Sequence, residues 1–278
     1  MALRYTAPNS LPLAGISLGN RRRLTTLHRA VRGPFTIDEA AVALVLDRER
    51  TAKLLSHWVR QGWLARIRSG VYLTVPLEAE SPAGWVEDAW AVLSRVFEPC
   101  YIGGWSACEH WGFTEQVFRD VVLFTAKRIR RRTGSIQGTA FVAKVVPEAH
   151  LFGMRRVWRR DVQIDVSDPI RTIVDVLDDP KIGGGMRHVA DVVRAYFASE
   201  HRNDSDLLSY ARRVGNRTVY KRLGFLIERL EIDAPRVVSE CRARQSVGYS
   251  KLDPGGPNRG KLWRRWRLRE NVEIHSTR

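Results

Sequence analysis

The sequence predicts an α+β protein with a small N-terminal domain and a larger, mixed α/β domain. Its 278 residues are enough for two ordinary domains. The proportions of hydrophobic residues (44%) and charged residues (27%) are those of a globular chain that buries a core without disulfide bonds. A stretch of small and helix-breaking residues at 78–84 separates two patterned blocks. We expect a loose N-terminal arm at 1–19 and domains at 20–80 and 84–278.

Charge is the most informative part of the composition. The chain has 46 Lys and Arg residues against 30 Asp and Glu residues, a formal net charge of +16. Such an excess favours a polyanionic partner, usually a nucleic acid. No stretch approaches the ~18 apolar residues of a membrane-spanning helix. The apolar segment at 11–18 is broken by Pro12 and Gly15, unlike a signal peptide. We therefore expect a cytoplasmic protein that does not bind a membrane.

The N-terminal block has the element order of a winged helix-turn-helix. Thr36 and Glu39 have the spacing of a capping box, which opens the second helix. Asp47 is a suitable N-cap for the third helix, and Gly62 ends that helix. The predicted elements are helices at 21–31, 36–44 and 48–61, followed by strands at 63–67 and 71–75 around a tight turn at 68–70. Three helices and a two-stranded ribbon in this order are typical of this DNA-binding fold.

The third predicted helix has two distinct faces. At ~100° per residue, its apolar side chains share one face; these are Ala52, Leu54, Leu55, Trp58 and Val59. The opposite face is polar and suits contacts with base edges and phosphates. The predicted DNA contacts are Arg48, Arg50, Thr51, Lys53, His57 and Arg60 from the helix, with Arg66 and Arg68 from the ribbon. The alternative is a charged face that is merely solvated.

The second block mixes helical and strand patterns. An Asp168-Pro169 pair predicts the start of a long apolar helix. Helices are predicted at 84–98, 106–112, 168–177, 186–199, 204–213 and 217–231, and strands at 121–124, 139–146, 151–157, 162–166 and 262–268. A basic loop at 127–132 is either a solvated turn or a second basic surface for phosphates, RNA or a protein partner; its cations are Lys127, Arg128, Arg130, Arg131 and Arg132. Trp263 and Trp266 either stack on nucleotides or pack the C-terminal strand.

Several motifs that are typical of enzymes are incomplete in this sequence. Residues 255–261 nearly match a phosphate-binding loop, but Leu262 follows where Ser or Thr is needed. Asp161 and Asp165 lack the strand-borne lysine of a restriction-type nuclease. The three cysteines have no CxxC spacing. We therefore predict no catalytic residues, no metal site and no cofactor.

A set of short segments, in order along the chain, resembles the AbiEi antitoxins of AbiE-type toxin–antitoxin and abortive-infection systems, which act in phage defence. The segments are RSGVY at 68–72, YIGGWSA at 101–107, WGFTEQ at 111–116, RTIVD at 171–175 with Pro180 and Gly183-Gly184 after it, 210–215, KRLGFLIE at 221–228 and WRLREN at 266–271. The resemblance implies a winged-helix autorepressor joined to an antitoxin domain. It also implies a neighbouring toxin of nucleotidyltransferase fold, which such antitoxins often antagonise indirectly.

The first functional hypothesis is therefore an antitoxin and transcriptional repressor without enzymatic activity. It would bind an inverted repeat of double-stranded DNA at its own promoter, as two copies. Two alternatives stay open: a DNA-targeted, nuclease-like protein, and a transcription factor whose second domain senses a ligand.

Overall fold

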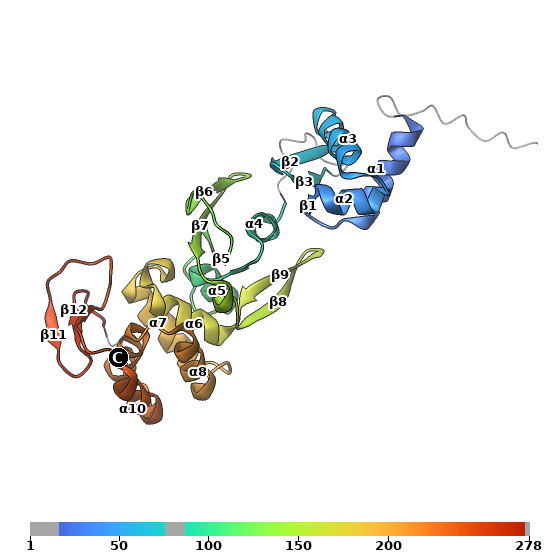
Figure 1. The fold of residues 1–278 in the computed structure, drawn as a ribbon. Helices are drawn as coiled ribbons and strands as arrows, with labels where there is room; N and C mark the ends of the chain where they lie inside the picture. Colours follow the sequence, from blue (N-terminus) through green and yellow to red (C-terminus); the bar gives the residue numbers. More distant parts are fainter. Residues whose placement is uncertain (1–16, 76–86, 276–278) are drawn as a thin grey trace, which may run out of the picture. The chain divides into compact units, whose positions relative to one another are not determined.

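The computed structural model describes residues 17–75 and 87–275, and the chain divides into two units, Met1–Trp85 and Val86–Arg278. Each unit has its own buried core, and each is described by itself. Unit 1 consists of helices and a small sheet, and unit 2 is a larger mixture of helices and strands (Figure 1). The predicted α+β fold class is confirmed. Among the described residues, no helix combines the length and apolar character that a bilayer crossing requires.

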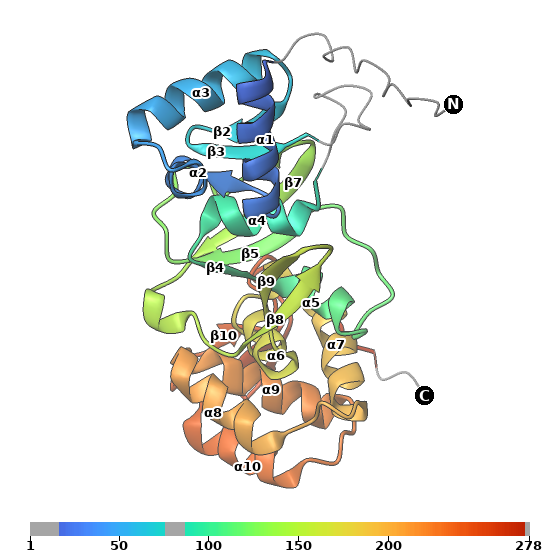
Figure 2. The same cartoon turned by 90° about the vertical axis from the view of Figure 1, so that its right-hand side faces the viewer.

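Within its described residues, 17–75, unit 1 has three helices and a three-stranded sheet (Figure 2). Its elements are α1 (Leu18–Ala30), β1 (Phe35–Thr36), α2 (Ile37–Leu44), α3 (Arg48–Arg60), β2 (Leu64–Arg68) and β3 (Val71–Thr74). The sheet order is β1-β3-β2, with both pairs antiparallel. The N-terminal arm was predicted too long, because Ser17 caps α1 and the helix begins at Leu18. The rest of that predicted arm lies outside the described residues.

Local capping interactions set the start of α2 and α3, as predicted. The Thr36 amide donates to Glu39 (2.8 Å) and the Glu39 amide donates to the Thr36 hydroxyl (3.3 Å), which completes the capping box. The Asp47 carboxylate accepts from the Arg50 amide (2.8 Å) at the start of α3. Between the two helices, Val45 has a left-handed backbone (φ 53°), which makes the turn sharp.

The core of unit 1 is formed by one face of α3 against the other elements. Leu55 and Trp58 of α3 are buried with Leu27 of α1, Phe35 of β1 and Leu64 of β2. This burial is the main stabilising contribution available to so small a unit. It also fixes which side of α3 points to solvent.

A mixed six-stranded sheet begins unit 2. Its order is β6-β7-β5-β4-β9-β8, in which β5–β7 and β4–β9 are parallel and the other neighbours are antiparallel. The strands are β4 (Cys100–Ile102), β5 (Val121–Thr125), β6 (Thr133–Ile136), β7 (Thr139–Val145), β8 (Met154–Arg159) and β9 (Val162–Ser167), and the accompanying helices are α4 (Ala89–Phe97) and α5 (Gly104–His110). The sequence did not predict β6, and β8 begins later than the predicted strand at 151–157.

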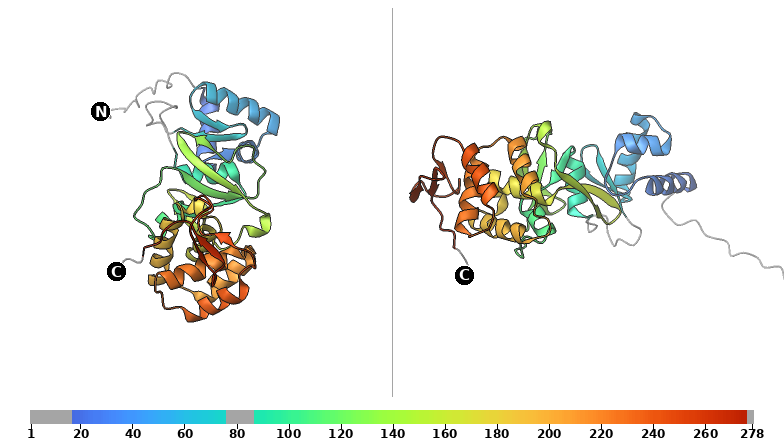
Figure 3. Two further views of the ribbon diagram at one scale, coloured as in Figure 1. Left: turned by 90° about the vertical axis from the view of Figure 1, so that its left-hand side faces the viewer. Right: turned by 90° about the horizontal axis from the view of Figure 1, so that it is seen from below.

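A cluster of helices and a small sheet complete unit 2 (Figure 3). The helices are α6 (Pro169–Asp178), α7 (Met186–Ala198), α8 (Asp204–Val214), α9 (Thr218–Arg229) and α10 (Pro235–Arg244), with short 3-10 turns at Glu148–His150 and Pro180–Gly183. The strands are β10 (Ser250–Lys251), β11 (Lys261–Trp263) and β12 (Leu268–Glu270). Helix α6 contacts α5, α7, α8 and α9. The single C-terminal strand predicted at 262–268 is wrong, because a turn with Arg267 at φ 49° divides it.

Trp266 holds the C-terminal sheet against α9. Its ring is fully buried over Gly224, and its indole nitrogen donates to Glu228 (2.6 Å). A Cβ added at Gly224 would overlap the ring, so only glycine allows this approach. Of the two alternatives for the C-terminal tryptophans, Trp266 therefore has the packing role.

We predict that Gly224→Ala destabilises unit 2 by about 1–3 kcal/mol, because the methyl group forces the Trp266 ring out of its site. Thermal or urea unfolding followed by tryptophan fluorescence measures the loss. Gly248→Ala is the matched control, because a Cβ there meets no atom within 4 Å. Equal stability of the two variants would show that Trp266 does not anchor the sheet.

Candidate nucleic-acid interface

The solvent-facing side of α3 carries the exposed cations predicted from the sequence. The side chains of Arg50 and Lys53 are 79% and 76% exposed. Arg48 and Arg60 are also exposed, and His57 is half-buried. Since Leu55 and Trp58 fix the other side of the helix in the core, these cations are presented on a rigid element.

Each of the first three cations has a nearby carboxylate. Arg48 pairs with Asp38 (2.7 Å), Arg50 with Asp47 (3.2 Å) and Lys53 with Glu49 (2.7 Å). Exposed pairs of this kind contribute only about 0–1 kcal/mol each. They hold the side chains in place and are weak enough to be exchanged for phosphate contacts.

Thr51 is a correction to the predicted set of DNA contacts. Its side chain is fully buried, and its hydroxyl donates to the Asp47 carbonyl oxygen (2.8 Å). The residue lies on the same face as Leu55 and Trp58, one and two turns further along the helix. It therefore contributes to packing, and a bound nucleic acid cannot reach it.

The ribbon of unit 1 presents its two arginines differently. Arg66 is exposed, and its guanidinium donates to the Ser69 hydroxyl (3.3 Å) at the turn. Arg68 is half-buried, burial lowers its pKa, and its Nε is buried without a hydrogen-bond partner among the described residues. A bulge between the two shifts the strand register, and Gly70 closes the turn at φ 80°. Arg66 is thus the more accessible of the two.

In unit 2, the basic loop at 127–132 is largely open to solvent. Its exposed cations are Arg128, Arg130, Arg131 and Arg132. Lys127 differs, because it is half-buried and its ammonium donates to the Val96 carbonyl oxygen of α4 (3.3 Å). The loop therefore offers four of the five predicted cations as a basic surface.

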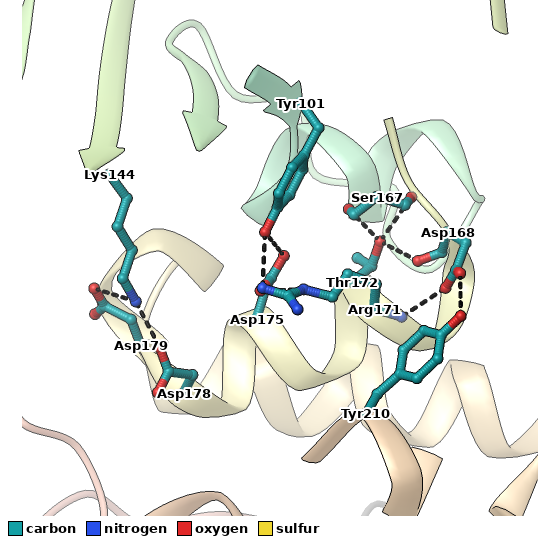
Figure 4. Close-up of polar contacts among 10 residues, drawn as sticks. All are labelled: Tyr101, Lys144, Ser167, Asp168, Arg171, Thr172, Asp175, Asp178, Asp179 and Tyr210. Carbon is teal, nitrogen blue, oxygen red and sulfur yellow. Dashed lines mark hydrogen bonds and ion pairs between the residues drawn. The ribbon is translucent and has the colours of Figure 1, made fainter. Parts of the chain in front are cut away.

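A buried polar network lies where α6 meets the sheet (Figure 4). Arg171 and Asp175 form an ion pair (2.9 Å) in which both side chains are 2% exposed. The Tyr101 hydroxyl from β4 donates to Asp175 (2.9 Å) and accepts from Arg171 (3.0 Å). At the start of α6, Asp168 caps the helix (2.7 Å) and accepts from the Tyr210 hydroxyl (3.0 Å). The network joins the sheet, α6 and α8.

Burial dominates the titration behaviour of this network. It raises the pKa of Asp175 to about 6, against the opposing effects of Arg171 and Tyr101. It also raises the pKa of Tyr101 well above its usual value, helped by Asp175. The Phe152 ring lies 4.1 Å from the Arg171 guanidinium and partly replaces lost hydration. Most of its polar atoms are paired within the network; among the described residues, only the buried Nη1 of Arg171 has no hydrogen-bond partner there. The contacts tie elements of the fold together, which indicates a structural role.

The carboxylates do not assemble into a nuclease-like site. Asp161 is exposed in the turn after β8, and Asp165 on β9 faces Arg156 (3.6 Å). Lys144 on β7 instead contacts Asp178 (2.6 Å) and Asp179 (3.5 Å) at the end of α6 (Figure 4). Across 17–75 and 87–275, no three His, Cys, Asp or Glu side chains are grouped to hold a metal ion.

The phosphate-loop-like segment at 255–261 also lacks the structure that this motif needs. It leads into the short strand β11 and not into a helix. Asn271 donates to the Pro257 carbonyl oxygen (3.0 Å) and to the Asp253 carbonyl oxygen (2.8 Å), which ties the loop to the C-terminal segment. Trp263 is half-buried, with Lys261 4.5 Å from its ring.

Comparison with known proteins identifies the N-terminal part of the chain. Residues 22–75 match the family model described as transcriptional regulator, AbiEi antitoxin. This segment is therefore similar to the AbiEi antitoxins. The match covers α2, α3, the ribbon and most of α1. The resemblance to the AbiEi antitoxins that the sequence predicted is thus confirmed for this segment.

The fold of the chain as a whole is also found elsewhere. The crystal structure of the RV2827C protein from Mycobacterium tuberculosis aligns with a TM-score of 0.63 and 13% sequence identity, over 91% of this chain and 92% of that chain. At that identity, the likeness shows a shared fold alone. No curated protein matches this chain in a sequence comparison.

We predict that Asp175→Ala costs about 3–5 kcal/mol of unfolding free energy, because it leaves the buried Arg171 guanidinium without its counter-ion. Urea unfolding measures the change. Asp179→Ala is the control: its side chain is 35% exposed and lies 3.5 Å from Lys144, so the expected cost is about 1 kcal/mol or less. A small effect at Asp175 would mean that the ion pair does not stabilise the fold.

Proposed function

We propose that the protein is a cytoplasmic antitoxin of an AbiE-like toxin–antitoxin system that represses its own promoter and has no catalytic activity. The observation that carries this proposal is the exposed basic face of α3 inside a segment of the AbiEi regulator family. The geometry supports a role for α3 in the major groove of DNA, with the ribbon beside it.

The exposure and position of each cation indicate which part of the DNA it would contact. Arg50 and Lys53 lie in the N-terminal half of α3, where they would meet base edges or phosphates. Arg60 extends this face toward the C-terminal end of α3, Arg48 is an exposed cation at the first turn, and Arg66 would contact a phosphate from the ribbon. With two copies on an inverted repeat, each unit 1 would occupy one half-site.

Antitoxin action is assigned to unit 2 in this proposal. Unit 2 has its own core and carries the basic loop at 127–132, which unit 1 does not need for reading DNA. The proposed partner is a neighbouring toxin of nucleotidyltransferase type, as the family resemblance implies. A direct complex between the two proteins is not required.

We predict salt-sensitive, sequence-selective binding to the protein's own promoter. The logarithm of affinity should fall by about 0.9 per phosphate contacted for each unit of log salt concentration. Arg50→Ala and Lys53→Ala should each weaken binding by about 1–3 kcal/mol if they read bases, and should relieve repression of a promoter–reporter fusion.

Two controls make this test specific. Arg236→Ala removes an exposed cation from α10 of unit 2 and should leave repression unchanged. Circular dichroism should show that the α3 variants remain folded, because their side chains point away from the core. Normal repression by both folded variants, or equal affinity for promoter and random DNA, would show that α3 is not the recognition helix.

We predict that the two activities separate between the units. A fragment of residues 84–278 should rescue the growth of cells that express the neighbouring toxin, yet should not shift promoter DNA in a gel. The reason is that unit 2 has an independent core while the proposed groove-facing side chains all lie in unit 1. Rescue by residues 1–80 alone, or no rescue by a soluble and folded 84–278 fragment, would contradict this division.

A further inference from the structure

The edge strand β8 has two faces with opposite roles. The side chains of Arg155 and Arg159 turn toward the helices of unit 2: the Arg155 guanidinium lies 5.6 Å from the Trp111 ring, and that of Arg159 lies 4.7 Å from the Trp90 ring. Arg159 also pairs with Asp88 (2.9 Å) at the start of α4. On this inner face both arginines contact aromatic rings, and Arg159 is half-buried while Arg155 stays exposed.

The outer face of β8 combines an aromatic ring with cations. Trp158 is 63% exposed, and the Arg156 side chain on the same face is 75% exposed. Arg160, at the turn into β9, is 59% exposed. Figure 1 shows the β8–β9 hairpin extending beyond the helices of unit 2. We call Arg156, Trp158 and Arg160 the hairpin triad.

An exposed tryptophan at this position calls for an explanation. Charged residues are common on edge strands, because they discourage pairing with another chain, and the arginines fit that role. A large exposed ring has the opposite effect, because apolar surface on an edge strand favours association with another chain. Protection of the strand edge therefore does not account for the exposed indole.

We propose that the hairpin triad binds single-stranded nucleic acid, with Trp158 stacked on an unpaired base and Arg156 and Arg160 on adjacent phosphates. An aromatic platform flanked by cations is the usual composition of such sites. Side chains on one face of a strand recur every ~6.6 Å, so the ring and Arg156 can engage successive groups of an extended strand. Bases in a duplex are stacked on each other, and the ring would reach one only after unstacking it.

The ion pairs of the triad do not block this use. Arg156 lies 3.6 Å from Asp165, and Arg160 lies 3.5 Å from Glu87. Both arginines are mostly exposed, so these contacts are screened and weak. A guanidinium has five N–H donors, so an arginine that already has partners can also bind a phosphate. The proposal does not depend on the role proposed for unit 1, because every residue of the triad lies in unit 2.

The test uses the full chain with Arg50→Ala and Lys53→Ala, which removes the main proposed DNA contacts of α3. Fluorescence anisotropy measures binding to labelled oligonucleotides of about ten nucleotides, a length within the usual site size. The probes are oligouridine, oligothymidine and a duplex of mixed sequence. Binding to either single strand supports the proposal, and the ratio between the two shows whether RNA or DNA is preferred.

Trp158→Ala should weaken single-strand binding by about tenfold or more, and Trp158→Phe should retain most of it, because stacking needs only an aromatic face. Arg156→Ala should reduce the salt dependence by about 0.7 in the log–log slope. Val117→Ala removes another exposed apolar side chain (77% exposed) and should change nothing.

Three results would overturn the proposal. One is a parent chain that does not bind single strands. Another is a folded Trp158→Ala variant that binds them like its parent. The third is an equal loss of duplex and single-strand binding in that variant, since stacking on an unpaired base predicts a selective loss. Failure of the unit 1 proposal would instead appear as missing promoter binding by the unmodified chain.

Discussion

The near-complete burial of α6 is the constraint on which unit 2 depends. This helix lies between the six-stranded sheet and the helices α7 to α9, so eight of its ten residues are buried. Arg171 and Asp175 are among them, one helical turn apart. Inside the protein they form an ion pair with each other, and Asp175 accepts a hydrogen bond from Tyr101. A buried pair of this kind adds little net stability, but losing one member is costly, which makes the packing around α6 intolerant of change.

In unit 1, the packing of one helix, α3, has a comparable effect on the structure. Burial of Leu55 and Trp58 fixes the rotation of α3 about its own axis. The orientation of Arg50 and Lys53 then follows without further interactions, because 3.6 residues per turn place them on the opposite side. The same packing that buries one face of α3 therefore also exposes its cations on the other face.

Features set by neighbouring residues were predictable from the sequence, and those set by distant partners were not. The capping box at Thr36 and the Asp47 and Asp168 caps are local, and the structure has all three. Thr51 was assigned wrongly because its side chain is small and polar, although its spacing of four and seven residues from Leu55 and Trp58 places it within the apolar stripe. Helix α10 was missed because only Val237 and Cys241 of its ten residues are buried. The Tyr101 contact with Asp175 spans 74 positions and leaves no local pattern.

The alternation along β8 also limits how this part of the chain can evolve. Val157 and Ile164 are opposite each other in the register, and the same register places Trp158 opposite Gln163. Because successive side chains point to opposite faces, one inserted or deleted residue in the strand would turn the indole inward and turn Arg155 and Arg159 away from the rings that they contact. Substitutions at the outer positions leave the core intact, whereas a change in the length of the strand changes the side chains on both faces. Related chains should therefore vary in composition along this strand while keeping its number of residues constant.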